Sequence, residues 1–218
     1  MPDACLVLPH TCLVLPPDAR LQASTRGSGL STLMYGTTAE NVVSLQVVTP
    51  EGKLIRTRRR VRKSATGYEM TQLFVGSEGT LGIIVGLCLK LRKVPKVRCG
   101  AFIGFDELHD AATATMGLVR ASLSTLCRCE LLNANGVQAT NKKYGTTLEV
   151  RPTIFLEYRC DSMDICKADA AVGEMIARAS KCRQYEFADK GETLDKLWEA
   201  RRGCYIAAIR CVPWPVTV

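Results

Sequence analysis

Three glycines and two hydroxyl residues lie close enough together in one stretch to form a ligand-binding loop. The stretch reads Gly76-Ser77-Glu78-Gly79-Thr80-Leu81-Gly82-Ile83-Ile84, and the apolar run of residues 83–91 predicts a buried strand directly after it. Glycine permits backbone dihedral angles closed to other residues and lets N–H groups approach a ligand closely. Such a loop suits a phosphate, a ribityl chain or a ring edge. An ordinary Gly-rich turn before a strand fits the same residues.

The residues before this loop predict strands and tight turns. Residues 41–49 alternate and are rich in β-branched side chains, residues 50–53 (PEGK) supply a turn, and residues 54–57 return as the second strand of a hairpin. Residues 70–74 predict one short helical turn that leads into the loop. The chain before Pro95 is therefore expected to be β-rich.

After Pro95 the pattern changes to strands that alternate with helices. The predicted strands are 99–105, 128–132, 153–160 and 183–188, and the predicted helices are 106 or 110 to about 126, 162–179 and 192–209. The expected buried positions are Ala111, Ala114, Leu118 and Leu126 in the first helix, and Ile165, Ala168, Val172, Met175, Ile176 and Ala179 in the second. Four strands among helices predict an α+β sandwich with the helices on one face of the sheet.

The composition argues against several classes of protein. With 218 residues and 47% hydrophobic content, the chain can form one large or two small cores, and no apolar run approaches the roughly 18 residues of a membrane-spanning helix. No signal or transit peptide is recognisable. Eleven cysteines without a Cys-x-x-Cys pair indicate free thiols, and with only His10 and His109 as histidines no metal site is expected.

The net charge of +8 belongs to the first part of the chain. Residues 1–98 hold 14 basic and 6 acidic residues, whereas residues 99–218 hold 15 of each. Much of the excess lies in residues 58–63 (RRRVRK), a run that can mark nucleic-acid contact or nuclear import. Because no aromatic residues are interleaved for base stacking, we favour a solvated loop and expect no nucleic-acid partner. The run could add a positive field near an anionic cofactor.

Several blocks together resemble the FAD-linked oxidases of the vanillyl-alcohol oxidase and p-cresol methylhydroxylase type. The blocks are residues 28–42 (SGL…MYGT…ENV), 63–68 (KSATGY), the loop at 76–84, 129–133 (CELLN), 152–157 (PTIFLE) and 197–201 (LWEAR). They occur in consistent order over most of residues 10–211. The branch they resemble most is D-lactate dehydrogenase (cytochrome), which is related to D-2-hydroxyglutarate dehydrogenase and glycolate oxidase.

The resemblance implies two partial domains. Residues 1–98 would be the second half of a PCMH-type FAD-binding domain, and residues 99–218 an α+β cap or substrate domain with an antiparallel sheet and helices on one face. It also implies the residues that contact FAD: Gly27, Ser28, Gly29, Leu30, Ser77, Glu78, Gly79, Thr80, Leu81, Gly82 and Ile83. Judged without the resemblance, Ser28 and Gly29 suit a plain turn.

The resemblance further implies a reaction. Relatives of this type oxidise a D-2-hydroxy acid, with hydride transfer to the flavin and electrons passed to cytochrome c or a quinone. Arg201 matches the arginine that faces the substrate carboxylate, although beside Glu199 and Arg202 a solvated surface arginine is the ordinary interpretation. Tyr68 is expected either near the flavin or in the core. No catalytic residue is assigned, because the histidine motifs and the zinc-like divalent metal of complete relatives have no counterpart in this sequence.

Two hypotheses remain open at this point. The first is an FAD-dependent D-2-hydroxy-acid dehydrogenase, in the mitochondrion or the cytoplasm. The second is a non-catalytic remnant that keeps the cap scaffold without holding FAD, because the first half of the flavin domain and its pyrophosphate-binding loop are missing from the sequence.

Overall fold

The computed structural model describes residues 17–59, 61, 65–189, 194, 195, 198, 201 and 204. The chain divides into two compact units, Met1–Val94 and Pro95–Val218, and each has its own hydrophobic core. We call them the first and the second unit. Within the described ranges, no helix has both the length and the apolar character needed to cross a membrane.

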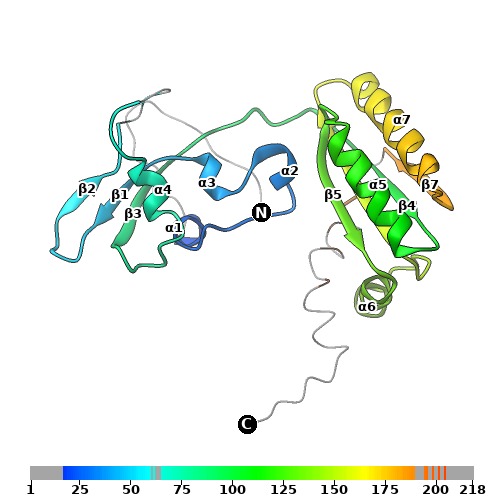
Figure 1. Cartoon of the computed structure of the whole chain (residues 1–218), viewed down its shortest axis with the longest axis horizontal. Helices are drawn as coiled ribbons and strands as arrows, with labels where there is room; N and C mark the ends of the chain where they lie inside the picture. The colour runs from blue at the N-terminus through cyan, green and yellow to red at the C-terminus, as the bar shows by residue number, and fades with distance from the viewer. Residues whose placement is uncertain are drawn as a thin grey trace, which may run out of the picture. The chain divides into compact units, whose positions relative to one another are not determined.

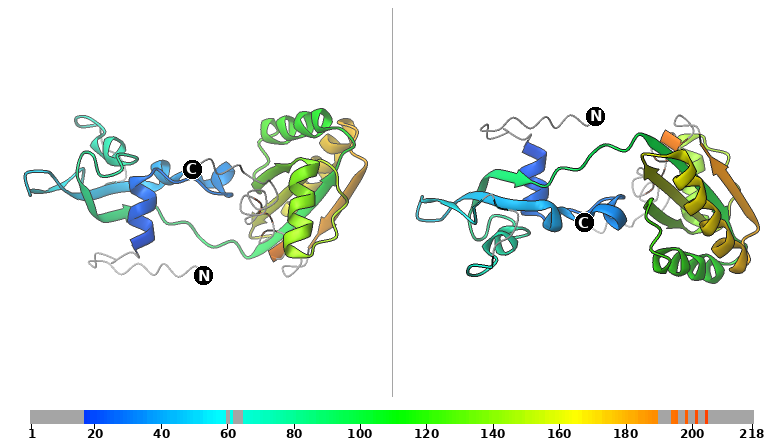
Figure 2. Two further views of the ribbon diagram at one scale, coloured as in Figure 1. Left: turned by 90° about the horizontal axis from the view of Figure 1, so that it is seen from below. Right: turned by 90° about the horizontal axis from the view of Figure 1, so that it is seen from above.

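A three-stranded antiparallel sheet forms the centre of the first unit (Figures 1 and 2). Its strands are β1 (Val42–Val48), β2 (Leu54–Arg56) and β3 (Ile83–Leu89), in the order β2-β1-β3. Val48 pairs with Leu54 on one side and with Ile83 on the other. Gly52 supplies the positive φ of +76° that the turn between β1 and β2 requires. The predicted hairpin and the strand after the glycine loop are both confirmed.

In the described part of this unit, four short helices accompany the sheet: α1 (Pro17–Ser24), α2 (Thr32–Tyr35), α3 (Thr38–Asn41) and α4 (Met70–Phe74). The helical turn at 70–74 was predicted, whereas α1 was not. A capping box begins α3, since the Thr37 side chain accepts from the Ala39 N–H and Glu40 accepts from the Thr37 N–H. The apolar core lies on one face of the sheet, where α1 contacts β3 and α4 contacts β1.

Only one face of β3 is buried, which corrects the expectation of a buried strand. Ile84 is buried, whereas Ile83 and Val85 are 66% and 39% exposed. Side chains alternate between the two faces of a strand. Because the described helices pack on the face that carries Ile84, the other face of the sheet remains accessible.

The second unit combines a four-stranded antiparallel sheet with helices, as the sequence predicted, and two of its helices lie on one face of the sheet (Figure 1). The strands are β4 (Val97–Gly104), β5 (Leu126–Leu132), β6 (Thr153–Cys160) and β7 (Gln184–Ala188), in the order β5-β6-β4-β7. Helices α5 (Leu108–Arg120) and α7 (Met163–Ala179) pack side by side against it. Helix α6 (Ala134–Tyr144), which follows β5, was not predicted; Asn133 caps it by accepting from the Gly136 N–H at 2.8 Å.

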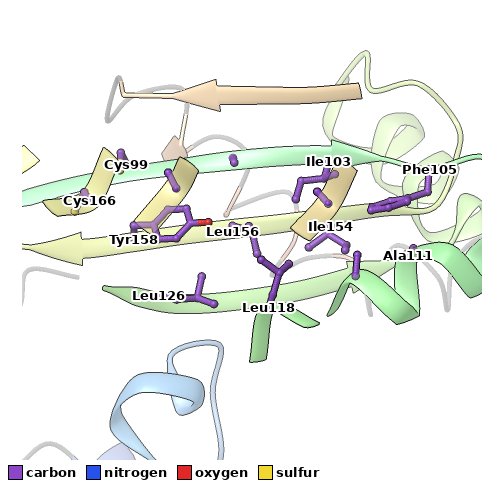
Figure 3. Close-up of a cluster of buried hydrophobic side chains, with 14 residues drawn as sticks. Cys99, Ile103, Phe105, Ala111, Leu118, Leu126, Ile154, Leu156, Tyr158 and Cys166 are labelled. Carbon is purple, nitrogen blue, oxygen red and sulfur yellow. The ribbon is translucent and has the colours of Figure 1, made fainter. Parts of the chain in front are cut away.

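The core of the second unit lies between this sheet and the two helices (Figure 3). Ile154, Leu156 and Tyr158 of β6 point into it together with Ile103 of β4, and Leu118 of α5 packs against them. Each of these five side chains is fully buried. The alternate positions of β6, Phe155 and Glu157, therefore lie on the opposite face of the sheet.

The buried side of α7 matches the predicted one only in part: Ile176 packs against the core but is not fully buried. Ile165 and Met175 are 52% and 63% exposed, while the buried positions are the small residues Cys166, Ala170, Gly173 and Ala177. Small residues let the helix approach the sheet closely: a Cβ placed on Gly173 would lie 2.4 Å from the Tyr158 hydroxyl oxygen. The size of the facing side chains, rather than their hydrophobicity, decides which side of α7 is buried.

Helix α5 ends earlier than predicted and begins without the predicted cap. Its N-cap residue is Glu107, whose side chain makes no capping hydrogen bond, and the helix stops at Arg120. Leu126, expected at the end of this helix, is the first residue of β5. Ala111, Ala114 and Leu118 are buried on one side of α5 as predicted.

Candidate functional site

The glycine loop (residues 76–84) is attached by its backbone to the end of α1. The Gly76 N–H donates to the Ala23 carbonyl oxygen at 3.0 Å, and the Glu78 N–H donates to the Ser24 carbonyl oxygen at 3.0 Å. The segment 27–30 begins three residues after Ser24. The fold therefore joins the glycine loop to the residues that lead directly into segment 27–30, the other segment that the sequence singled out for the same ligand.

Three positions in the loop have backbone dihedral angles that favour glycine. Gly76, Gly79 and Gly82 have φ values of +88°, +83° and +155°. A Cβ on Gly82 would lie 2.7 Å from the Val48 carbonyl oxygen, and one on Gly76 would lie 3.1 Å from Arg26 Cβ. Glycine at 82 thus lets the loop press against β1, and glycine at 76 lets it pass the turn after α1.

Polar groups of the loop are left available for a ligand. The Ser77 hydroxyl oxygen is buried and has no hydrogen-bond partner among the described residues. Within the same part of the chain, the N–H groups of Gly79 and Leu81 donate no hydrogen bond. A Cβ at Gly79 or Gly29 would meet no atom within 4 Å. The Gly79 N–H, an unpaired donor next to open space, fits a phosphate or ribityl oxygen of a dinucleotide.

Thr32 organises the segment 27–30. Its hydroxyl accepts from the Gly29 N–H at 3.1 Å, donates to the Gly29 carbonyl oxygen at 2.6 Å and lies 3.0 Å from the Ser28 hydroxyl. The Thr38 hydroxyl holds the Gly27 carbonyl oxygen at 2.8 Å. Ser28 and Gly29 are exposed and Leu30 is half-buried, so the turn is held from one side and presents the other to solvent.

The other candidates of the first unit lie at the surface. Glu78, Thr80, Leu81 and Ile83 are exposed, and Thr80 is bonded through its hydroxyl to the Ser77 carbonyl oxygen at 2.6 Å. Tyr68 is 93% exposed, which excludes the expected alternative of a core residue.

The basic run 58–63 is described only in part. Arg58 pairs with Glu69 at 3.2 Å and Arg59 is exposed. The remaining basic residues of the run, Arg60, Arg62 and Lys63, lie outside the described residues.

In the second unit, Arg201 is held by a carboxylate. Its Nη2 donates to Glu130 Oε2, and the two side chains are only 23% and 22% exposed. The Arg201 Nε is buried and has no hydrogen-bond partner among the described residues. Sequence reasoning missed Glu130 as the partner, although the block 129–133 in which it stands was part of the resemblance.

A network of charges around one buried carboxylate lies on the same face of the sheet. Glu157 is fully buried and accepts from Arg128 at 3.1 Å, with Arg159 in contact and the Arg98 Nε at 3.7 Å. Arg128 also lies 5.0 Å from the centre of the buried Trp198 ring. Burial lowers the pKa of Arg128, and the Glu157 carboxylate opposes that effect.

Residues of the segment after β7 cover this face. A Cβ on Gly100 would lie 2.6 Å from Leu194 Cδ2, the Trp198 ring lies 6.5 Å from the Phe155 ring, and Arg201 meets Glu130 on β5. The described residues of the segment, Leu194, Asp195, Trp198, Arg201 and Cys204, are helical; the rest of the predicted helix 192–209 lies outside the described residues. The spacing of 194, 198 and 201 puts these three side chains on one helical face.

No metal centre is found in the part of the chain that the structure describes, where no three His, Cys, Asp or Glu side chains are grouped so as to hold an ion. The eight described cysteines are free thiols.

Comparison with known sequences gives one family over more than half of the chain. The family model described as "FAD linked oxidases, C-terminal domain" matches residues 94–217. The chain is 36% identical over 201 residues to "Probable D-lactate dehydrogenase, mitochondrial" of Danio rerio, and 34% identical over 189 residues to "D-lactate dehydrogenase [cytochrome], mitochondrial" of Arabidopsis thaliana. These matches cover 90% and 85% of the chain but 40% and 33% of the relatives.

Solved structures show the same fold. An alkyldihydroxyacetonephosphate synthase superimposes with a TM-score of 0.64 at 20% identity, over 85% of this chain and 36% of that protein. A p-cresol methylhydroxylase with bound substrate superimposes with a TM-score of 0.60 at 13% identity, over 76% and 37% of the two chains. These proteins thus share a fold with this chain. Sequence identities this low do not show that they share a substrate.

Proposed function

This chain belongs to the FAD-linked oxidases, and we propose that it serves the FAD-dependent oxidation of a D-2-hydroxy acid resembling D-lactate. The resemblance expected from the sequence blocks is confirmed at the level of the family. The names of its relatives support D-lactate as the substrate type, a cytochrome as electron acceptor and a mitochondrial location. A quinone acceptor is the alternative, and a divalent metal remains an expectation for complete relatives.

The joining of the glycine loop to the end of α1 is the observation that carries the proposal. It sets the Ser77 hydroxyl and the N–H groups of Gly79 and Leu81, which have no hydrogen-bond partner among the described residues, at the end of α1, from which the chain continues into the turn that contains Gly29. We infer that residues 27–30 and 77–83 together bind FAD. Loops of this kind bind anionic and polyol groups through backbone donors.

Arg201 is the residue that we propose for the substrate carboxylate. A guanidinium holds a carboxylate through paired N–H donors, and the contact with Glu130 fixes its plane before substrate binds. Bound FAD would supply the acceptor for the α-hydrogen of the hydroxy acid. Trp198 and Leu194 cover the sheet beside Arg201 and exclude water from that face.

Flavin binding tests the proposal directly. We expect the purified chain, or the chain reconstituted with FAD, to show the visible absorbance bands of a bound flavin after gel filtration. A folded, colourless product that retains no FAD would contradict the proposal and favour a remnant that keeps the scaffold alone.

Two glycine substitutions separate ligand contact from folding. We expect Gly29→Ala to leave the free energy of unfolding unchanged or to raise it by about 0.5 kcal/mol, because its Cβ enters open space. The same Cβ should weaken FAD binding about tenfold if the cofactor passes there. Titration with FAD and urea denaturation measure the two effects.

The matched variant is Gly82→Ala. Its Cβ meets the Val48 carbonyl oxygen at 2.7 Å, so we expect a loss of about 2 kcal/mol in the stability of the first unit. Equal FAD affinity in Gly29→Ala and the unmodified chain would remove residue 29 from the proposed contact.

A further inference from the structure

Two thiols approach each other where β6 passes into α7. Cys160 is the last residue of β6 and Cys166 lies in the first turn of α7. Their Sγ atoms are 2.7 Å apart, whereas a disulfide bond measures about 2.05 Å. Both residues are free cysteines in this structure.

The backbone of the connection holds the pair in place. The Ser162 carbonyl oxygen accepts from the Cys166 N–H at 3.2 Å and from the Cys160 thiol at 2.7 Å. On its other side, the β6 end is anchored by the pairing of Cys160 with Val97 of β4. The approach of the two thiols therefore follows from the strand-to-helix turn itself.

The two thiols differ in their surroundings. Cys166 is fully buried, next to the buried Cys99, while Cys160 is half-buried. Burial raises the pKa of the Cys166 and Cys99 thiols, which keeps both protonated near neutral pH. Cys160 is thus the thiol that an oxidant in solution reaches, and Cys166 is placed to resolve the product.

We propose that Cys160 and Cys166 form a reversible disulfide, and that the oxidant is a small disulfide such as oxidised glutathione. The Cys160 thiolate attacks one sulfur of the oxidant and releases one glutathione thiolate. The Cys166 thiol then loses its proton to water and attacks the Cys160 sulfur, releasing the second glutathione. Two protein thiols are oxidised while one disulfide is reduced to two thiols.

Trypsin gives a direct test. Cleavage after Arg159 and after Lys167 places both cysteines in one peptide, residues 160–167 (CDSMDICK). After the folded chain is oxidised with glutathione disulfide and the remaining thiols are alkylated, we expect this peptide without alkyl groups and two hydrogens lighter than the dithiol. Reduction before alkylation should restore two alkylation sites.

Controls assign the effect to the fold. In a glutathione redox buffer, the disulfide fraction should correspond to an effective thiol concentration about tenfold above that of the isolated peptide 160–167. Cys204, whose thiol faces the Gly136 carbonyl oxygen at 3.9 Å, serves as the reference and should remain alkylatable. Cys160→Ser and Cys166→Ala should each abolish the oxidised peptide.

Three outcomes would overturn the proposal. The first is a peptide 160–167 that stays doubly alkylated after oxidation. The second is a cross-link between Cys166 and the peptide that begins at Cys99. The third is a disulfide fraction no higher in the folded chain than in the isolated peptide.

Discussion

Replacing Glu157 by glutamine is expected to lower the free energy of unfolding of the second unit by about 3 kcal/mol. Glu157 is fully buried and is surrounded by Arg98, Arg128 and Arg159. Glutamine keeps the shape but removes the buried negative charge that faces three arginines, which are 18% to 33% exposed. Arg98 keeps its second carboxylate partner, Asp195, at 2.6 Å, so the loss falls mainly on Arg128 and Arg159. Urea denaturation followed by tryptophan fluorescence measures the change.

Glu174→Gln is the matched control. Glu174 pairs with Arg178 one turn along α7, in a pair whose side chains are 37% and 64% exposed. Solvent screens such a pair, so its removal should change the unfolding midpoint little. If both variants lost the same small amount, the cluster around Glu157 would not contribute to stability as we describe.

Substituting lysine for Arg201 is expected to reduce kcat/KM for a D-2-hydroxy acid about 100-fold in the flavin-loaded chain. Lysine retains the positive charge but cannot offer paired N–H donors to a carboxylate. We expect KM to rise, while the redox properties of the flavin stay unchanged. Steady-state kinetics with an artificial electron acceptor measures both parameters.

Two comparisons test this assignment. Glu130→Gln should raise KM less than Arg201→Lys, because it loosens the orientation of the guanidinium without removing it. Arg178→Lys, on the exposed side of α7, should leave kcat/KM unchanged. An Arg201→Lys variant with the KM of the unmodified chain would show that the substrate carboxylate binds elsewhere.

Local signals predicted the strands well. Alternation and β-branched residues indicated the β1 and β2 hairpin, and residues 153–160 were predicted with the observed bounds of β6. These signals succeed because each is contained within a few neighbouring residues. Helices α1 and α6 lacked such a signal, because both are polar on average and neither shows a long apolar stripe.

Two features of the site depend on residues far apart in the chain. Glu130 and Arg201 are 71 residues apart, and the loop at 76–78 bonds to carbonyl groups of residues 23 and 24. Hydrophobic periodicity contains no information about such pairs. The buried side of α7 was likewise decided by its partner, because the Tyr158 hydroxyl leaves room for glycine only.

The sequence by itself determined the family, the glycine loop and the alternation of strands and helices after Pro95, since these follow from residue types in short windows. Only the tertiary structure decided which polar groups face each other. It left the Ser77 hydroxyl without a partner among the described residues, gave Arg201 a carboxylate, buried Glu157 among three arginines and brought Cys160 to Cys166. The physical reason is that burial and hydrogen bonding depend on packing between distant segments.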